Sequence, residues 1–435
     1  MNMIIAGDGH NNIVCENSVA PQASIWPIDE VKYDFILTSP PFGTAEGDAL
    51  SKSDADRYPV SGGRGQHLFL QRMVLATKPA GLISTVIDDG LLNTETGTEL
   101  RRWVMQHAQL LAVLRLPEVT FKPNKINVRS SVLLLRKREN VDTDLLDSAP
   151  VSFVDIETLG YTGTGDPIRG FDYPAFLDSV INGALDSAAG AQRSGLHWSA
   201  FEIPARTIGK DSTSRWDLKY WQPATTQAVD QVVSGGGQAI ATLNQIDTKR
   251  GKSPASSTYV GPEDGYAVVI KAGSCLTRCG TVTIEGADWI EKASFDDTAD
   301  APKVQKGDVL IASTGDGTLG KAAVWDRDER AIADGHVTIV RVDPDVIDPY
   351  YLADYLRAGL GKLQIEPLFT GSTGLIELTP EHVNRIVVPL LSSVSEQKNL
   401  SMALRTAEGA HQASVSQAFG ELDASRQTFL EAAVG

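Results

Sequence analysis

The first 140 residues of this 435-residue chain alternate short apolar runs with stretches of helical periodicity. The apolar runs predict strands and the periodic stretches predict helices. The expected strands are Phe35–Thr38, Gly81–Ile87, Leu110–Leu114 and Ser131–Leu135, and the expected helices are His67–Leu75 and Glu99–Met105. Strands that alternate with helices are typical of a doubly wound α/β sheet with parallel strands. The sequence therefore predicts an α/β domain over residues 1–140.

Three further segments follow this domain. Residues 141–210 are rich in Gly, Asp, Ser and Pro, which predicts an irregular extension and linker. From residue 211 to 392, short β-like runs such as Tyr266–Ile270 lie between turn signals and predict an α+β domain. Residues 393–435 repeat apolar side chains every three or four positions, which predicts one long amphipathic helix suited to packing against another helix.

Composition excludes several classes of protein. The net charge of −16 argues against binding DNA by bulk electrostatics, so a DNA-binding role requires locally concentrated basic residues. No apolar run reaches the roughly 18 residues of a membrane helix, and the N-terminus lacks a secretory signal, so we expect a cytoplasmic protein. The three cysteines, Cys15, Cys275 and Cys279, predict neither a disulfide framework nor a zinc site.

A polar residue and two prolines follow the first predicted strand directly. Active sites of open α/β sheets lie just beyond the carboxyl ends of strands. Pro40 and Pro41 fix φ and donate no N–H, which would hold the neighbouring carbonyls rigidly. Ser39 Oγ and the Pro40 carbonyl could accept both hydrogens of a base's exocyclic amine and draw its lone pair out of conjugation. Phe42 could then stack on a flipped-out base, with no covalent nucleophile or metal. A proline-bounded turn is the alternative.

The segment Ser39–Phe42 is similar to the Asp/Asn/Ser-Pro-Pro-Tyr/Phe motif of amino-methyltransferases that make N6-methyladenine or N4-methylcytosine. Further segments resemble the modification subunit of type I restriction-modification systems; they are Leu68–Met73, Lys78–Gly81, Asp88–Leu92 and Arg115–Phe121. The resemblance implies methyl transfer from S-adenosylmethionine to a base of double-stranded DNA. It also implies that Phe121 helps to hold the flipped base, although a buried core phenylalanine is the alternative.

Two departures from this family bear on substrate and cofactor. The family usually has Asn where this chain has Ser39, and Ser is commoner among cytosine-N4 enzymes. The surrounding segments that resemble the modification subunit favour adenine, while cytosine stays open. The resemblance also implies that an acidic residue after the third strand of the family's fold bonds the adenosine of the cofactor. Its best match here is Glu16, for which an ordinary surface glutamate is the alternative.

The glycine-rich turn with which such enzymes bind S-adenosylmethionine has no match upstream of Ser39. The Gly-containing segment Gly7–Gly9 follows no adequate strand. Gly315–Gly320 has the form Gly-x-Gly-x-x-Gly, but the run Lys321–Trp325 after it predicts a strand rather than a helix. We therefore expect a partner chain to bind most of the cofactor and to complete the sheet beside the apolar edge strand Phe35–Thr38.

Residues 211–433 resemble the target-recognition domain and spacer helix of type I specificity subunits, in segments such as Arg215–Trp221, Lys306–Gly315 and Pro349–Leu352. The resemblance implies recognition of a DNA site and pairing of the C-terminal helix, which permits a dimer of heterodimers. Expected phosphate contacts are Lys249, Arg250, Lys252, Lys271, Arg278, Ser313, Thr314 and Lys321, with a solvated surface as the alternative for each. No nuclease or helicase motif is found. A non-catalytic DNA-binding module remains the second hypothesis.

Overall fold

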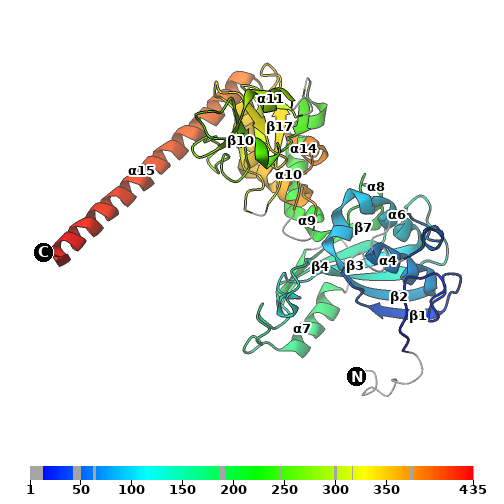
Figure 1. Ribbon diagram of the computed structural model, residues 1–435. Helices are drawn as coiled ribbons and strands as arrows, with labels where there is room; N and C mark the ends of the chain where they lie inside the picture. Colours follow the sequence, from blue (N-terminus) through cyan, green and yellow to red (C-terminus); the bar gives the residue numbers. More distant parts are fainter. Residues whose placement is uncertain are drawn as a thin grey trace. The chain divides into compact units, whose positions relative to one another are not determined.

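A computed structural model describes residues 13–42, 50–61, 65–185, 192–244, 246–297, 301–315, 317–371 and 376–434 (Figure 1). The segment Gly7–Gly9 lies outside these ranges. The chain divides into two compact units, each described by itself. Unit 1 comprises Met1–Pro223 with Thr370–Gly374, and unit 2 comprises Ala224–Phe369 with Leu375–Gly435.

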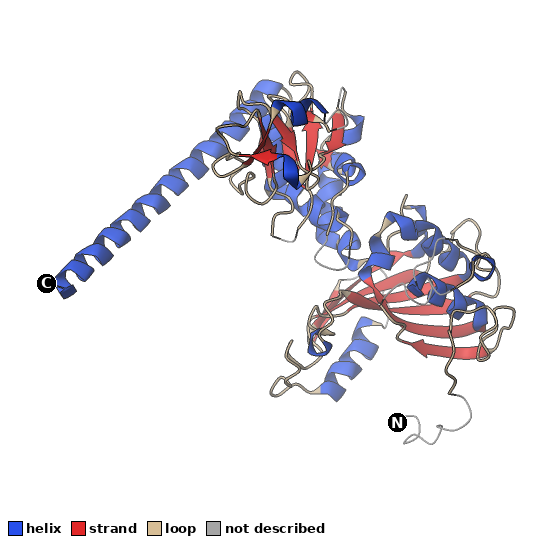
Figure 2. Cartoon of the chain, in the orientation of Figure 1, coloured by secondary structure: helices blue, strands red, loops and turns tan. Residues whose placement is uncertain are grey.

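A seven-stranded sheet forms the centre of unit 1 (Figure 2). In spatial order its strands are β1 (Tyr33–Thr38), β2 (Thr77–Asp88), β4 (Ser130–Lys137), β3 (Ala108–Arg115), β5 (Pro150–Ile156), β7 (Trp198–Pro204) and β6 (Arg193–Gly195). β1 is parallel to β2 and β3 is parallel to β5, whereas β4 runs antiparallel between β2 and β3. The α/β class is thus confirmed. The three strands that alternate with helices, β1, β2 and β3, run in the same direction as expected, whereas β4 returns antiparallel beside β3 without a crossover helix.

The carboxyl ends of β1, β2, β3 and β5 lie at one edge of this sheet, because these four strands run in the same direction. Helices α4 (Gly65–Ala76) and α6 (Thr98–His107) contain the two predicted helices and pack on one face. The hydrophobic core beneath them joins Ile36 and Ile83 of the sheet with Leu70 and Val104 of the helices. The short helices α3 (Lys52–Ala55), α5 (Asp89–Asn93), α8 (Ala205–Lys210) and α9 (Leu218–Trp221) complete this unit with α7, described below.

The opposite face of the sheet is open at β1 and β2 in the described part of unit 1. Phe35 and Leu82 are in-register neighbours, so both side chains point to this face, and they are 56% and 38% exposed. Leu37, two residues further along β1, is 74% exposed. Phe35, Leu37 and Leu82 together form the open apolar face of unit 1. β1 is also the edge strand of the sheet, so its outer backbone groups have no strand partner among the described residues. Such a surface favours pairing with another element.

Residues 141–210 contain three strands of the sheet, so the prediction of an irregular linker was wrong. β5 and β7 pair antiparallel along their full lengths, and Phe153 stacks on Phe201 with ring centroids 5.4 Å apart. Helix α7 (Tyr173–Ser179) and a π-helical turn (Val180–Ala184) cover the second face of the sheet at these strands through Phe176 and Val180. Loops rich in Gly and Asp flank these short strands and obscure their pattern in the sequence.

The segment Arg215–Trp221 belongs to the core of unit 1, so the expected domain start at residue 211 is corrected. Trp216 is fully buried; its backbone N–H donates to Leu92 O at 2.9 Å and its indole nitrogen lies 3.3 Å from Met105 Sδ. The Arg215 guanidinium pairs with the Asp217 carboxylate through two bonds of 2.7 Å. These contacts tie the segment to α5 and α6, and the unit ends only at Pro223.

Unit 2 contains the short strands that its sequence predicts. A five-stranded sheet has the order β10 (Tyr259–Val260), β12 (Asp288–Ile290), β11 (Ala267–Ile270), β16 (Ala331–Ala333) and β13 (Lys303–Val304). A four-stranded sheet has the order β15 (Ala322–Val324), β14 (Val309–Ala312), β17 (Val337–Arg341) and β9 (Asp247–Arg250), and β18 (Val387–Val388) pairs with β8 (Gln238–Ala239). The two larger sheets share one hydrophobic core. The helices are α10 (Pro223–Ser234), α11 (Lys292–Asp297), α12 (Pro349–Arg357), α13 (Gly359–Leu368) and α14 (Pro380–Arg385).

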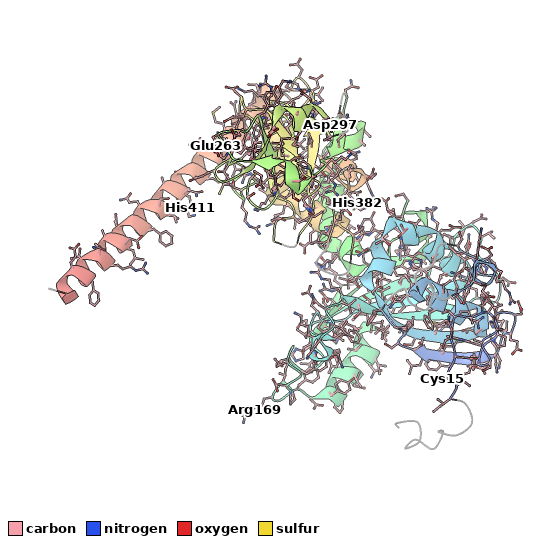
Figure 3. All side chains as sticks on the ribbon, in the orientation of Figure 1. Cys15, Arg169, Glu263, Asp297, His382 and His411 are labelled. Atoms are coloured by element: carbon pink, nitrogen blue, oxygen red, sulfur yellow. The ribbon has the colours of Figure 1, made fainter. Side chains whose placement is uncertain are left out.

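The predicted C-terminal helix is confirmed as α15 (Val394–Val434). Its first turns are anchored to α12, where Asp354 accepts two bonds from Arg405 and Arg357 donates two to Glu408. Beyond these anchors the described side chains are exposed, including His411 (Figure 3). Val415, Phe419, Leu422 and Phe429 recur at helical spacing along this part. No described helix is both long enough and apolar enough to cross a membrane.

Candidate active site

The segment Ser39–Phe42 follows the last residue of β1 directly. Pro40 is buried, Phe42 is half-buried, and Ser39 and Pro41 are exposed. Ser39 makes no hydrogen bond within the described ranges, so its hydroxyl is available to a ligand. The segment therefore presents a rigid turn with an accessible polar group at the edge where β1, β2, β3 and β5 end.

The structure brings together the two aromatic residues that the sequence singles out for base stacking. The rings of Phe42 and Phe121 meet edge to face, with centroids 5.1 Å apart and an interplanar angle of 74°. Both side chains are half-buried. The loop between β3 and β4, which carries Phe121, is thereby held against the turn that follows β1. Two segments distant in sequence thus form one aromatic site beside Ser39.

Several hydrogen bonds fix the loop that carries Phe121. Thr120 Oγ1 donates to the carbonyl of Pro117 at 2.6 Å, and Arg129 pairs with Glu118 at 2.9 Å. Tyr161 Oη donates to the carbonyl of Thr120 at 3.0 Å. Tyr161 lies in the segment expected to be a linker, and no motif in the sequence marks it as part of the site.

Polar groups also gather where β2 and β3 end. The Arg115 guanidinium binds the Asp155 carboxylate through bonds of 2.9 and 2.7 Å, which joins the ends of β3 and β5. Gln66 Oε1 accepts from the backbone N–H of Asp88 at 3.1 Å. Gln66 Nε2 is buried and has no partner in the described part of the chain. Gln66 lies within an apolar helical pattern, and nothing in the sequence indicates that it belongs to the site.

The pKa of Asp89 is raised to about 6, mainly by burial and further by the nearby carboxylate of Asp217. Ser131 Oγ donates to Asp89 Oδ1 at 3.1 Å and partly opposes this shift. The shift gives the first prediction. An unfolded aspartate has a pKa of about 3.9, so the folded state retains the proton at higher pH than the unfolded state does. Stability therefore falls as pH rises from about 4 through about 6.

Asp89→Asn should abolish this pH dependence and raise the free energy of unfolding by about 1 to 3 kcal/mol near pH 7. Denaturant unfolding at a series of pH values measures the effect. Asp144→Asn changes an exposed aspartate of the same unit and should leave the dependence of the unfolding free energy on pH unchanged. The expectation would be contradicted if the free energy of unfolding changed with pH in the same way in Asp89→Asn and in the unsubstituted protein.

Glu16, the expected cofactor residue, is engaged with its own loop. Its Oε1 accepts from the backbone N–H of Ser24 at 2.8 Å, from Ser24 Oγ at 2.9 Å and from the N–H of Ile25 at 3.4 Å. These hydrogen bonds, the Ser24 N–H first, lower the pKa of the carboxyl group. The carboxylate of Glu16 therefore binds groups of its own loop in this structure.

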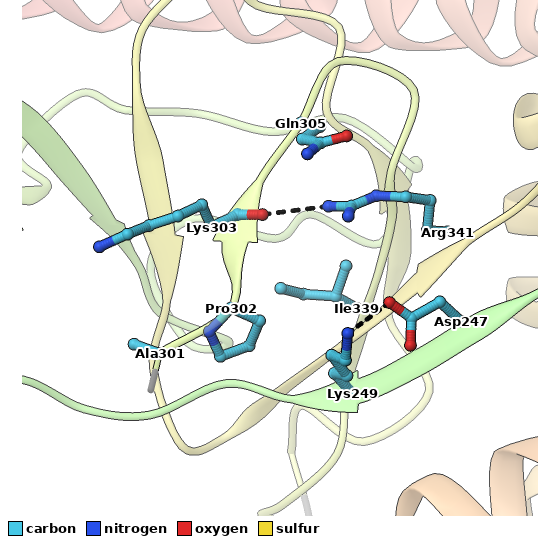
Figure 4. A pocket seen from close by; sticks show the side chains of 8 residues that line it. All are labelled: Asp247, Lys249, Ala301, Pro302, Lys303, Gln305, Ile339 and Arg341. Atoms are coloured by element: carbon cyan, nitrogen blue, oxygen red, sulfur yellow. Dashed lines mark hydrogen bonds and ion pairs between the residues drawn. The ribbon is translucent and has the colours of Figure 1, made fainter. Parts of the chain in front are cut away.

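The expected phosphate contacts of unit 2 are mostly tied to neighbouring groups. Lys249 pairs with Asp247 at 2.6 Å beside a cavity of about 350 Å³ that Arg341 also lines (Figure 4). Arg250 pairs with Glu377 at 2.6 Å. Lys252 is exposed and engaged in a further contact.

Lys271, Arg278 and Lys321 lie around two neighbouring turns of unit 2. Lys271 forms an ion pair with Asp288. Arg278 donates to the carbonyl of Gly317 at 2.9 Å, and Lys321 donates to that of Gly273 at 3.3 Å. These three are the expected DNA contacts that the structure brings together.

The expectation for Ser313 is corrected, because its side chain is fully buried and donates to Thr338 Oγ1 at 2.7 Å. It cannot reach a phosphate from there. Thr314 Oγ1 lies 2.6 Å from His336 Nδ1 and stays half-buried. Gly315–Gly320 connects the antiparallel strands β14 and β15, so no helix follows it and it does not form a dinucleotide-binding turn.

Comparison with known proteins gives a match for the N-terminal segment. Residues 1–164 match the family described as N-6 DNA Methylase. The type I restriction enzyme StySPI methylase subunit of Salmonella potsdam is 31% identical over 105 residues, which cover 24% of this chain and 19% of that protein. The chain thus matches about a fifth of the length of this curated relative.

Two solved structures are similar to parts of this chain. The EcoKI M protein, a type I restriction enzyme subunit, is 18% identical, with a TM-score of 0.38 over 50% of this chain and 49% of that one. The HsdS subunit from Thermoanaerobacter tengcongensis is 14% identical, with a TM-score of 0.29 over 77% of this chain and 91% of that one.

Proposed function

We propose that the chain is the catalytic and DNA-specificity subunit of a split, site-specific DNA methyltransferase. It would methylate N6 of adenine in double-stranded DNA, within a restriction-modification or phage-defence system. The observation that carries the proposal is the contact of Phe42 with Phe121 beside the accessible Ser39, within a segment that matches N-6 DNA methylases. The aromatic pair and the polar turn lie at the edge where active sites of open α/β sheets are found.

The residues of this chain hold the target base. Ser39 Oγ and the Pro40 carbonyl accept the two hydrogens of the exocyclic amine, which frees the nitrogen lone pair. Phe42 stacks on the flipped base, and Phe121, whose ring meets that of Phe42 edge to face, contacts the base from the side. Both contacts offset part of the cost of taking the base out of the duplex. Pro41 keeps the turn rigid. S-adenosylmethionine supplies the methyl group, and no metal or covalent nucleophile is needed.

A partner chain supplies most of the cofactor site. The open apolar face of unit 1 supports this, because sheets of this class are normally covered on both faces. We propose that the partner adds strands beside β1 and a layer over Phe35, Leu37 and Leu82. Glu16 and Ser39 would then complete the cofactor site from this side.

Unit 2 would recognise the DNA sequence, with Lys271, Arg278 and Lys321 facing phosphates. The exposed stripe Val415–Phe429 of α15 would pair with a second copy and join two heterodimers. Light scattering on the assembled complex tests this stoichiometry, since a mass equal to one heterodimer would refute it. Cytosine N4 is the alternative target, because Ser39 stands where adenine-directed relatives usually have Asn.

The test is transfer of labelled methyl groups to duplex DNA by the chain alone and by the chain with its partner. Mass spectrometry of the nucleosides identifies the product. We expect N6-methyladenine, formed only when both chains are present. N4-methylcytosine would support the alternative target. DNA binding without transfer in either mixture would support a non-catalytic specificity module, and transfer by the chain alone would refute the split enzyme.

Leu37→Lys should weaken binding of the partner by about tenfold or more, because it places a charge on the open apolar face at its most exposed residue. Leu146, also strongly exposed, lies in the loop before β5, so Leu146→Lys is the matched control. Sedimentation of the mixed chains measures both affinities. Equal affinities for the two variants would show that the partner does not cover this face.

A further inference from the structure

The loop between Phe121 and β4 exposes two lysines without acidic partners. Lys122 and Lys125 are both exposed and form no ion pair in the described part of the chain. Asn124 and Asn127 are exposed beside them. Other cations at this edge are neutralised, as Arg115 is by Asp155 and Arg129 by Glu118. In a chain of net charge −16, two free lysines next to the candidate site form a local positive surface.

The backbone of this loop is held in one conformation. The N–H of Lys125 donates to the carbonyl of Lys122 at 2.8 Å, and Lys125 takes a left-handed conformation with φ of 61°. The N–H groups of Asn124 and Ile126 both donate to the carbonyl of Phe121, at 3.0 and 3.2 Å. The backbone positions of the two lysines are therefore fixed relative to that of Phe121, whose ring contacts Phe42.

A second loop, residues 160–167, packs against loop 122–127. Tyr161 and Pro167 form a β-bridge, and the N–H of Thr162 donates to the carbonyl of Asp166 at 2.9 Å. Gly165 has a φ of +92° and lies against Pro123. A Cβ atom added at position 165 would be 3.3 Å from Cβ of Pro123. Because a rigid loop loses little conformational entropy on binding, this brace favours a binding role.

We propose that Lys122 and Lys125 bind phosphates of the DNA backbone beside the flipped base, so that loop 122–127 is a DNA-binding site within the catalytic unit. This inference rests on the proposed function. Phosphate contacts carry no sequence information but fix the position of the duplex. A duplex held at this loop would present its target nucleotide to the adjacent pair Phe42 and Phe121. The exposed amides of Asn124 and Asn127 can donate to the same backbone.

The test uses the full chain with its partner and a labelled duplex that carries the methylated site. Affinity is measured over a range of NaCl concentrations for Lys122→Ala/Lys125→Ala. The slope of log affinity against log salt should fall in magnitude by about 1.8, since each lost phosphate contact removes about 0.9. Lys122→Arg/Lys125→Arg should retain the slope of the unsubstituted complex, because both cations remain.

Lys210→Ala is the matched control, because Lys210 is exposed in α8, which follows β7 at the opposite edge of the sheet. It should leave the slope unchanged, and partner binding should be the same in all variants. If the complex methylates DNA but the double alanine variant keeps the full slope, the loop inference is overturned and the proposed function stands. If the unsubstituted complex neither binds nor methylates DNA, both are overturned.

Discussion

Ser39→Ala should lower kcat for methyl transfer by about 10²- to 10³-fold in the assembled complex, with little change in DNA affinity. The hydroxyl oxygen is one of two acceptors proposed for the exocyclic amine, and it is exposed without a hydrogen bond in the described structure. Its interaction with the amine strengthens as the nitrogen lone pair leaves conjugation, so its loss affects the transition state more than the bound state. Single-turnover methylation with excess complex measures the rate of the chemical step.

Ser39→Asn provides the informative control. The asparagine side chain also offers an acceptor oxygen, and it is the residue most common at this position in the family that the segment resembles. We expect it to retain most of the activity on adenine. Full activity of Ser39→Ala would contradict the acceptor role, and equal losses in the two variants would indicate that Ser39 serves only to shape the turn.

Arg101→Met should lower the free energy of unfolding of unit 1 by about 3 to 5 kcal/mol. The guanidinium is fully buried and donates to four backbone carbonyls, those of Leu91, Thr94, Thr213 and Ser214, at 2.6 to 3.0 Å. Methionine has a similar length but no donor, so it leaves these carbonyls buried without partners. Hydrogen exchange of peptides from α6 measures the loss, with unit 2 peptides as the internal reference.

Arg102→Met is the matched control, because Arg102 is the next residue of α6 and also bonds the segment 211–214, but from an exposed position. Water can replace its bonds, so the expected cost is below about 1 kcal/mol. Similar effects of the two substitutions would mean that burial of the Arg101 carbonyl partners contributes little to stability.

The sequence predicted the strands and helices that carry a strong period, and it missed those that do not. The first four strands and both helices lie close to the expected ranges, because each is a sustained apolar pattern. β5 and β7 were missed because loops without periodicity surround them. Arg215–Trp221 was placed in the wrong unit, since sequence alone does not show that Trp216 packs on Met105.

Some residues of the candidate site were predicted from the sequence and others were not. Ser39–Phe42 and Phe121 were predicted from a motif and a resemblance, and the structure places the two phenylalanines in contact. Gln66, Asp155 and Tyr161 were not predicted, because their places in the site depend on strand order and on loops that fold back. Ser313 was predicted as exposed, but the polarity of a short segment does not reveal which hydroxyl faces the core.

The open apolar face of unit 1 has a consequence for protein supply in the cell. A newly made chain that shows Phe35, Leu37 and Leu82 to water would be a substrate for chaperones and proteases until the proposed partner covered them. Surplus copies of this chain would be degraded, and the amount of active enzyme would follow the scarcer of the two chains. Balanced synthesis, such as translation from one messenger RNA, would then matter more for activity than the strength of either promoter.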